Sequence, residues 1–106
     1  MTNNNMYFIA NWKMFGNLSS INSINKVINL TKLKKYKKTR IVYCPPYTLL
    51  EAFVKKTKKS KISVGAQNCH YESNYGPNTG FVNSKMIKDT GSKFVIIGHS
   101  EMRNEG

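Results

Sequence analysis

The sequence predicts an α/β protein built on a parallel sheet with helical crossovers. Short apolar runs at 6–10, 40–44, 61–66 and 93–97 alternate with segments whose apolar residues recur at helical spacing. Parallel strands need such crossovers, because a short hairpin cannot join them. The runs lack polar alternation, which is expected of strands that are buried on both faces. Two architectures remain open on this pattern: a small doubly wound sheet and part of a closed barrel.

The first helix is expected between the runs at 6–10 and 40–44. Ser19 or Ser20 would be its N-cap, and the helix would fade near Lys35. Its apolar residues recur at helical spacing and predict one buried face, made of Ile21, Ile24, Val27 and Ile28.

Two further helices and one long loop follow. Pro45 and Pro46 end the second apolar run, since neither suits a central strand, and a helix over 47–56 comes next. A short helix begins at Asn83 or Ser84 and stops at Gly91. The loop at 69–81 is rich in Asn and Gly, and loops of that length inside a compact domain tend to be functional.

The chain is small and strongly basic, with 106 residues and a formal charge of +12. Its lysines cluster at 32–38 and 55–61, where predicted helices end and cations complement the helix dipole. A solvated face and a whole-chain compositional bias explain this pattern. The alternative is a binder of nucleic acid or another anion, although arginine, the usual reader of guanine, occurs only at Arg40 and Arg103.

Cysteine usage and the hydrophobic runs bear on the compartment. Cys44 and Cys69 form no CxxC pair and are too few for a disulfide framework, which favours a reducing compartment. The start of the chain lacks a signal-peptide pattern, and no apolar run approaches the ~18 residues that a transmembrane helix needs. We therefore expect a cytoplasmic protein that does not associate with membranes.

Polar residues lie just beyond the carboxyl ends of the predicted strands, where both open α/β sheets and barrels place their sites. They are Asn11, Lys13, Gln67, Asn68 and His99.

Lys13 and His99 are the strongest chemical candidates among them. Lys13 is either an ordinary surface lysine or, beside an asparagine at a strand end, a group that meets an anionic substrate. His99 is either a satisfied core histidine or a neutral hydrogen-bond donor, because Gly98 lets the backbone turn and a helix opening at Ser100 disfavours the charged imidazole.

Several other chemistries lack support. The stretch around Ser100 has no second glycine, so it is not a GxSxG nucleophile elbow. Cys44, Cys69, His70 and His99 have no metal-ligand spacing, and His70 reads as a loop residue. Neither GxGxxG nor GxxxxGK occurs, which leaves nucleotide binding unsupported.

Longer motifs then resemble one family. "ANWKM" (10–14), "CPPYTLL" (44–50), "VGAQNCHYES" (64–73), "TG" (79–80) and "MIKDTGSKFVIIGHSEMR" (86–103) are similar to the amino-terminal part of triosephosphate isomerases, in the family's order and spacing. The resemblance implies a (β/α)8 TIM barrel, normally of ~250 residues, of which this chain holds the first four βα units and is truncated after strand four. Residues 1–106 would be the amino-terminal half of a single barrel domain.

The resemblance also implies a reaction and roles. The family interconverts dihydroxyacetone phosphate and D-glyceraldehyde 3-phosphate, a step of glycolysis and gluconeogenesis, through an enediol or enediolate without cofactor or metal. Asn11 and Lys13 would bind substrate, and Lys13 would also supply positive charge to the developing oxyanion. By the same resemblance, His99 would polarise the carbonyl as a neutral imidazole, which is the family's established chemistry. Glu101 would position Lys13 or relay protons.

The family's general base has no counterpart in the sequence. That base is a glutamate in a segment like AYEPVW, and none of the acids present lies in such a segment. We therefore expect a partial sequence of a full enzyme, and an isolated chain that is inactive. A natural half barrel that dimerises remains the alternative to a partial sequence, and a basic α/β module that binds nucleic acid remains the alternative to an enzyme.

Two departures from the family pattern occur together. The family's third loop reaches into the partner subunit, where a TGE glutamate typically pairs with the first arginine of GHSERR. Here Phe81 follows Thr79 and Gly80, and Met102 replaces that arginine. We expect a homodimer in the full-length protein, with Thr79, Phe81 and Met102 at the interface and a sulfur–aromatic contact in place of the ion pair.

Overall fold

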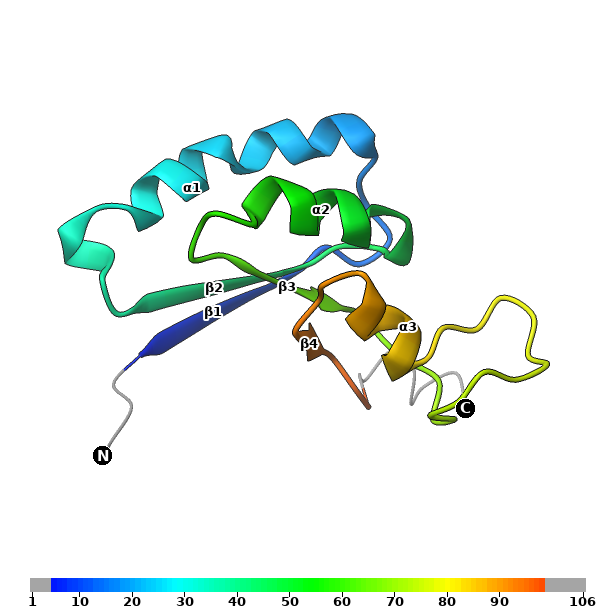
Figure 1. The fold of residues 1–106 in the computed structure, drawn as a ribbon. Coiled ribbons are helices and arrows are strands. Elements are labelled where there is room, and N and C mark those ends of the chain that lie inside the picture. Colours follow the sequence, from blue (N-terminus) through cyan, green and yellow to red (C-terminus); the bar gives the residue numbers. More distant parts are fainter. Residues whose placement is uncertain (1–4, 99–106) are drawn as a thin grey trace.

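Four parallel strands form a curled half-barrel in the computed structural model, which describes residues 5–98 (Figure 1). The strands are β1 (Met6–Asn11), β2 (Thr39–Cys44), β3 (Ser63–Ala66) and β4 (Phe94–Val95). They lie in the order β1-β2-β3-β4, and each pairs with the next in parallel. A doubly wound sheet reverses its strand order at a switch point, so this unbroken sequential order decides for the barrel.

The helices cover one face of the sheet. Helices α1 (Asn25–Thr31) and α2 (Leu50–Thr57) lie side by side above it, and α3 (Ser84–Asp89) follows the long loop (Figure 1). Short 3-10 segments precede or follow them: η1 (Leu18–Ile24), η2 (Lys34–Tyr36) and η3 (Tyr47–Leu49). The core lies between these helices and the sheet and consists of Ile24, Leu49, Leu50, Phe53, Val64, Ala66 and Ile87.

The opposite face of the sheet is open, which corrects the expectation of strands buried on both faces. The side chains from Met6 to Ile9 in the edge strand β1 alternate between the two faces, and all are about half exposed or more. Ile97, beyond β4, is 72% exposed. In a closed barrel the inner face is covered by the remaining strands, because all eight contribute to its packed layers. A half-barrel leaves that face and two sheet edges accessible.

The first helix begins and ends earlier than expected. Its N-cap is Asn17, not Ser19 or Ser20: the Asn17 side chain accepts from the Ser19 N–H at 3.0 Å, and Ser20 Oγ accepts from the Asn17 N–H at 3.0 Å. This reciprocal pair satisfies two amides that a cap at either serine would leave open. Helix α1 stops at Thr31 rather than near Lys35. Of the predicted face, Ile24 is fully buried and Ile21 and Ile28 pack against the core.

Other boundaries shift by a few residues. The third run forms a strand only over 63–66, and the fourth only over 94–95, shorter than the expected 61–66 and 93–97. Beyond β4 the Ile96 N–H still donates to the Ala66 carbonyl at 2.9 Å. The expected helix at 47–56 opens as η3 and continues as α2 to Thr57. The third helix confirms the prediction, with Asn83 as N-cap and its side chain bonded to the Met86 N–H.

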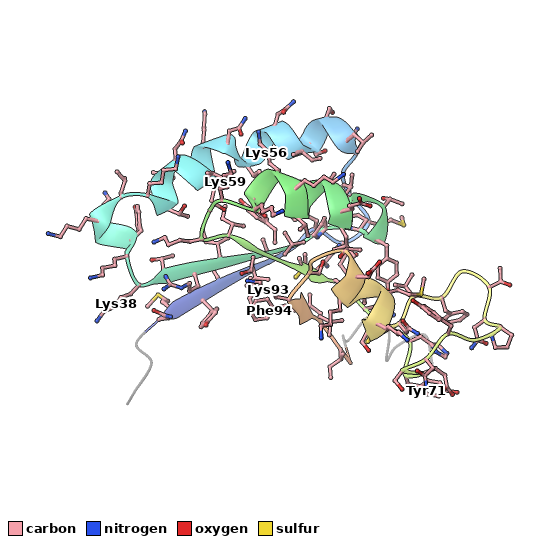
Figure 2. The ribbon with its side chains drawn as sticks, viewed as in Figure 1. Lys38, Lys56, Lys59, Tyr71, Lys93 and Phe94 are labelled. Carbon is pink, nitrogen blue, oxygen red and sulfur yellow. The ribbon has the colours of Figure 1, made fainter. Side chains whose placement is uncertain are left out.

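The lysine clusters lie where the helices end, as expected. The cluster at 32–38 follows α1, and the one at 55–61 spans the end of α2. Lys38, Lys56 and Lys59 project from the ribbon as a solvated face would (Figure 2). Lys61 links the two clusters, because its ammonium donates to the Tyr36 carbonyl at 3.0 Å.

We predict that Phe53→Ala unfolds much of the chain. The Phe53 side chain is 0% exposed, so truncation removes contacts and leaves a cavity, at a cost of about 3–5 kcal/mol in the free energy of unfolding. Phe15→Ala is the matched control: Phe15 is 73% exposed, and we expect a change within about 0.5 kcal/mol. Urea titrations followed by circular dichroism measure both, and equal losses would contradict this core.

Candidate active site at the carboxyl ends of the strands

The carboxyl ends of β1, β2 and β3 meet at one rim of the sheet. Asn11, the last residue of β1, pairs in register with Cys44, the last residue of β2. The next amide, the Trp12 N–H, donates to the Cys44 carbonyl at 3.0 Å and continues the ladder by one bond. Gln67 follows directly after β3. Segments that are far apart in sequence therefore reach the rim together.

Gln67 ties these three strand exits to one another. Its Nε2 donates to the Cys44 carbonyl at 2.9 Å and to the Lys13 carbonyl at 2.7 Å. An amide nitrogen carries two N–H donors, so one group can serve both carbonyls. We call this set of hydrogen bonds the Gln67 clamp.

Lys13 has an unusual backbone conformation at this rim. Its φ is 55°, and it is the one non-glycine residue with positive φ within 5–98. The left-handed region costs an L-residue roughly 1–2 kcal/mol, so the surroundings must hold it. Asn11 Oδ1 accepts from the Lys13 N–H at 2.8 Å, and Gln67 holds the Lys13 carbonyl. The peptide groups on both sides of the Lys13 Cα are thus fixed.

Trp12 anchors the same turn to the core. Its ring lies edge-on to Phe53 at 5.0 Å and to Tyr43 at 6.1 Å. Gly16 completes the turn with a φ of 113°, and a Cβ on it would lie 3.0 Å from the Trp12 ring. The half-buried Trp12 packs on the core side of this turn, and Lys13 is exposed on the other side. The lysine thus lies at the solvent edge of a rigid segment.

Two other titratable groups lie near the rim, the Cys44 thiol and the Tyr47 hydroxyl, and both have raised pKa values. Burial raises the pKa of the Cys44 thiol, against a smaller opposing effect of a hydrogen bond with the Gly65 backbone. Burial, followed by the nearby Cys69, raises the pKa of Tyr47, whose hydroxyl donates to the Asn68 carbonyl at 2.6 Å. Neither group is activated as a nucleophile, and the rim offers a cation and hydrogen-bonding amides for an anionic ligand.

The structure brings some of the predicted site residues together. Asn11 Oδ1 accepts a hydrogen bond from the Lys13 N–H, and Gln67 donates one to the Lys13 carbonyl. Sequence reasoning placed Gln67 at the rim but missed its double hydrogen bond, which depends on strand register. Gly98 has a φ of 60°, which confirms the expected sharp turn. His99, Glu101 and Met102 lie outside the described residues.

Thr79 and Phe81 lie on the long loop, which projects away from the sheet (Figure 1). Phe81 is 61% exposed, and its ring packs edge-on to His70 at 5.0 Å. His70 anchors the start of the loop: its N–H donates to the Val82 carbonyl at 2.7 Å and its Nδ1 accepts from the Glu72 N–H. His70 is therefore a loop residue, as expected, and its hydrogen bonds hold the two ends of the loop together.

The described part of the chain has neither a metal-binding cluster nor a membrane-spanning helix. Residues 5–98 bring no three His, Cys, Asp or Glu side chains together in a way that could hold a metal ion. The helices of this part of the chain are all too short or too polar to cross a membrane.

Comparison with known proteins identifies the family. The family model described as triosephosphate isomerase matches residues 6–105, which is nearly the whole chain. The chain belongs to the triosephosphate isomerase family. A triosephosphate isomerase from Bradyrhizobium sp. (strain ORS 278) is 39% identical over 95 residues, and one from a Wolbachia of Brugia malayi is 39% identical over 97.

The structural comparison agrees with the sequence comparison. The crystal structure of triosephosphate isomerase from Bartonella henselae superimposes with a TM-score of 0.82 at 34% sequence identity, over 92% of this chain and 39% of that one. The two curated relatives are likewise covered over 37% and 40% of their length, against 89% and 92% of this chain. The chain thus spans well under half of a triosephosphate isomerase and corresponds to the first four βα units.

Proposed function

We propose that this chain supplies the substrate-binding part of an isomerase site for triose phosphates. The observation that carries the proposal is the placement of Asn11 and Lys13 at one rim in a chain of the triosephosphate isomerase family. A lysine held rigidly at the carboxyl ends of barrel strands suits an anionic substrate, because its position is set before the substrate arrives. The reaction needs neither cofactor nor metal.

The proposed roles follow from the chemistry of the isomerisation. A base removes a proton from the carbon beside the carbonyl, and negative charge develops on the carbonyl oxygen. Lys13 stabilises that charge and the phosphate, and Asn11 binds substrate beside it. His99 donates a proton to the oxygen and shuttles it between the two oxygens of the enediolate, and Glu101 positions Lys13 or relays protons.

The carbon base would come from outside these 106 residues. The acids within 5–98 are Glu51, which pairs with Lys55 at 3.4 Å on α2, Glu72 in the long loop and Asp89 at the end of α3, and none lies in a segment like that of the family's base. We infer that residues 1–106 form the amino-terminal half of one barrel domain in a cytoplasmic enzyme of glycolysis and gluconeogenesis. Within residues 5–98 the structure adds no feature that favours nucleic acid or a membrane as partner, since the lysine clusters lie where helices end.

The isolated chain should bind dihydroxyacetone phosphate weakly and not turn it over. Loss of a positioned base typically removes about 10²–10⁴-fold in rate, before the loss of other loops is counted. The assay is a coupled measurement of D-glyceraldehyde 3-phosphate formation with the purified chain, alongside a binding titration followed by the chain's amide resonances. Lys13→Met should abolish the binding, whereas Lys56→Met, a lysine on the outer side of α2, should leave it unchanged. Turnover at the rate of a full-length family member, or equal binding by both variants, would contradict the proposal.

We also propose that a complete barrel containing this chain is a homodimer through the loop at 69–81. The loop carries exposed aromatic side chains, with Tyr71 86%, Tyr75 72% and Phe81 61% exposed, and such side chains are enriched at protein interfaces. Phe81 would contact Met102 of the partner subunit, and Thr79 would lie beside that contact.

In the complete barrel, Phe81→Glu should weaken the dimer. The carboxylate would be buried at the interface without the arginine that pairs with it in the family. Sedimentation at low concentration gives the dissociation constant, which we expect to rise at least about tenfold, a cost near 1.4 kcal/mol. Leu30→Glu, at a 48% exposed site on α1, is the control and should leave the dimer intact. Identical sedimentation of both variants would rule out the Phe81 contact.

A further inference from the structure

The Gln67 side chain has an orientation that its two partners determine. Its Nε2 lies 2.7 Å from the Lys13 carbonyl oxygen and 2.9 Å from the Cys44 carbonyl oxygen. These are short to ordinary lengths for N–H···O hydrogen bonds. An amide oxygen in that place would face two acceptors, so only the nitrogen end fits.

The two bonds of the clamp do different work. The Cys44 carbonyl also accepts from the Trp12 N–H, so β1 and β2 stay paired at this point without Gln67. The bond to the Lys13 carbonyl reaches a residue 54 positions away in sequence and fixes the left-handed segment itself. Loss of Gln67 should therefore affect the Lys13 segment more than the sheet.

We propose that Gln67 is a positioning residue for Lys13 and acts through the lysine's backbone rather than by touching substrate. The backbone at φ 55° sets the direction in which the Lys13 side chain leaves the rim. The clamp holds that backbone conformation before any ligand binds. Binding then costs less conformational entropy, since the cation is already placed. The inference rests on the proposed function in one respect: Lys13 must be the group that meets the anionic substrate.

Gln67→Glu is the sharpest test, because it replaces one nitrogen by oxygen and keeps the shape. At pH 7 the carboxylate cannot donate and faces two carbonyl oxygens, so the affinity for dihydroxyacetone phosphate should fall about tenfold relative to the unaltered chain. Asn29→Asp is the matched control: it makes the same atomic change and adds the same charge at an exposed position on α1, away from the rim. We expect it to bind within about twofold of the unaltered chain.

The pH dependence separates positioning from a general structural defect. A protonated carboxyl donates one hydrogen bond, so the tenfold deficit of Gln67→Glu should shrink as the pH falls toward about 4, the ordinary range of a glutamate pKa. Comparison with the unaltered chain at each pH cancels the titration of the substrate phosphate. A deficit that stays constant with pH, or no deficit at pH 7, would overturn the proposal.

A second variant, Gln67→Met, and hydrogen exchange of the Lys13 amide without ligand test the positioning role independently of substrate binding. Gln67→Met keeps the length without any donor, and its deficit should not change with pH. Exchange of the Lys13 amide hydrogen with solvent should be about tenfold faster in Gln67→Met than in the unaltered chain, whether or not ligand binds. Faster exchange in a chain that binds no triose phosphate would reject the proposed function and keep the positioning role. Unchanged exchange together with unchanged binding would reject the positioning role alone.

Discussion

The peptide carbonyl of Cys44 is the point on which the rim of this half-barrel depends. It accepts two hydrogen bonds, one from the Trp12 N–H at 3.0 Å and one from Gln67 Nε2 at 2.9 Å. One buried acceptor thereby joins the exits of three strands. A carbonyl has two lone pairs, so both bonds can form without competition. Because Gln67 also holds the Lys13 carbonyl, the backbone position of the lysine is tied to the pairing of the strands.

The same arrangement gives the half-barrel a core and an ordered rim without the rest of the barrel. Helices α1 and α2 cover one face and bury a core around Phe53, and Trp12 ties the rim to that core through its ring. The inner face has no such cover, and the apolar side chains of the edge strand β1 are about half exposed or more. Folding thus draws on the covered side, and the proposed substrate-binding residues lie at the rim that is attached to it. The proposed proton abstraction, like the closure of the inner face, would need the part of a triosephosphate isomerase that this chain does not span.

Particular residues show how far the sequence could predict this. Asn11 and Lys13 were predictable, because a polar residue after an apolar run marks a strand's carboxyl end. The cap at Asn17 was missed because Asn, Ser and Ser follow one another closely, and only the reciprocal bond to Ser20 selects the asparagine. The clamp was not predictable, since the reach of Gln67 depends on how β1, β2 and β3 align in space. Strand β4 is shorter than its apolar run indicates because pairing, not hydrophobicity, sets strand length.

Native-state hydrogen exchange of the Trp12 amide in the unaltered chain tests the central claim most directly. If the Cys44 carbonyl joins the strand exits, this amide is protected to the same degree as the ladder amides between β1 and β2, although Trp12 lies beyond the end of β1. Exchange at the rate of an unstructured peptide, with the β1–β2 ladder still protected, would contradict the account. The rim would then be loose at its centre, where the exits of the strands meet.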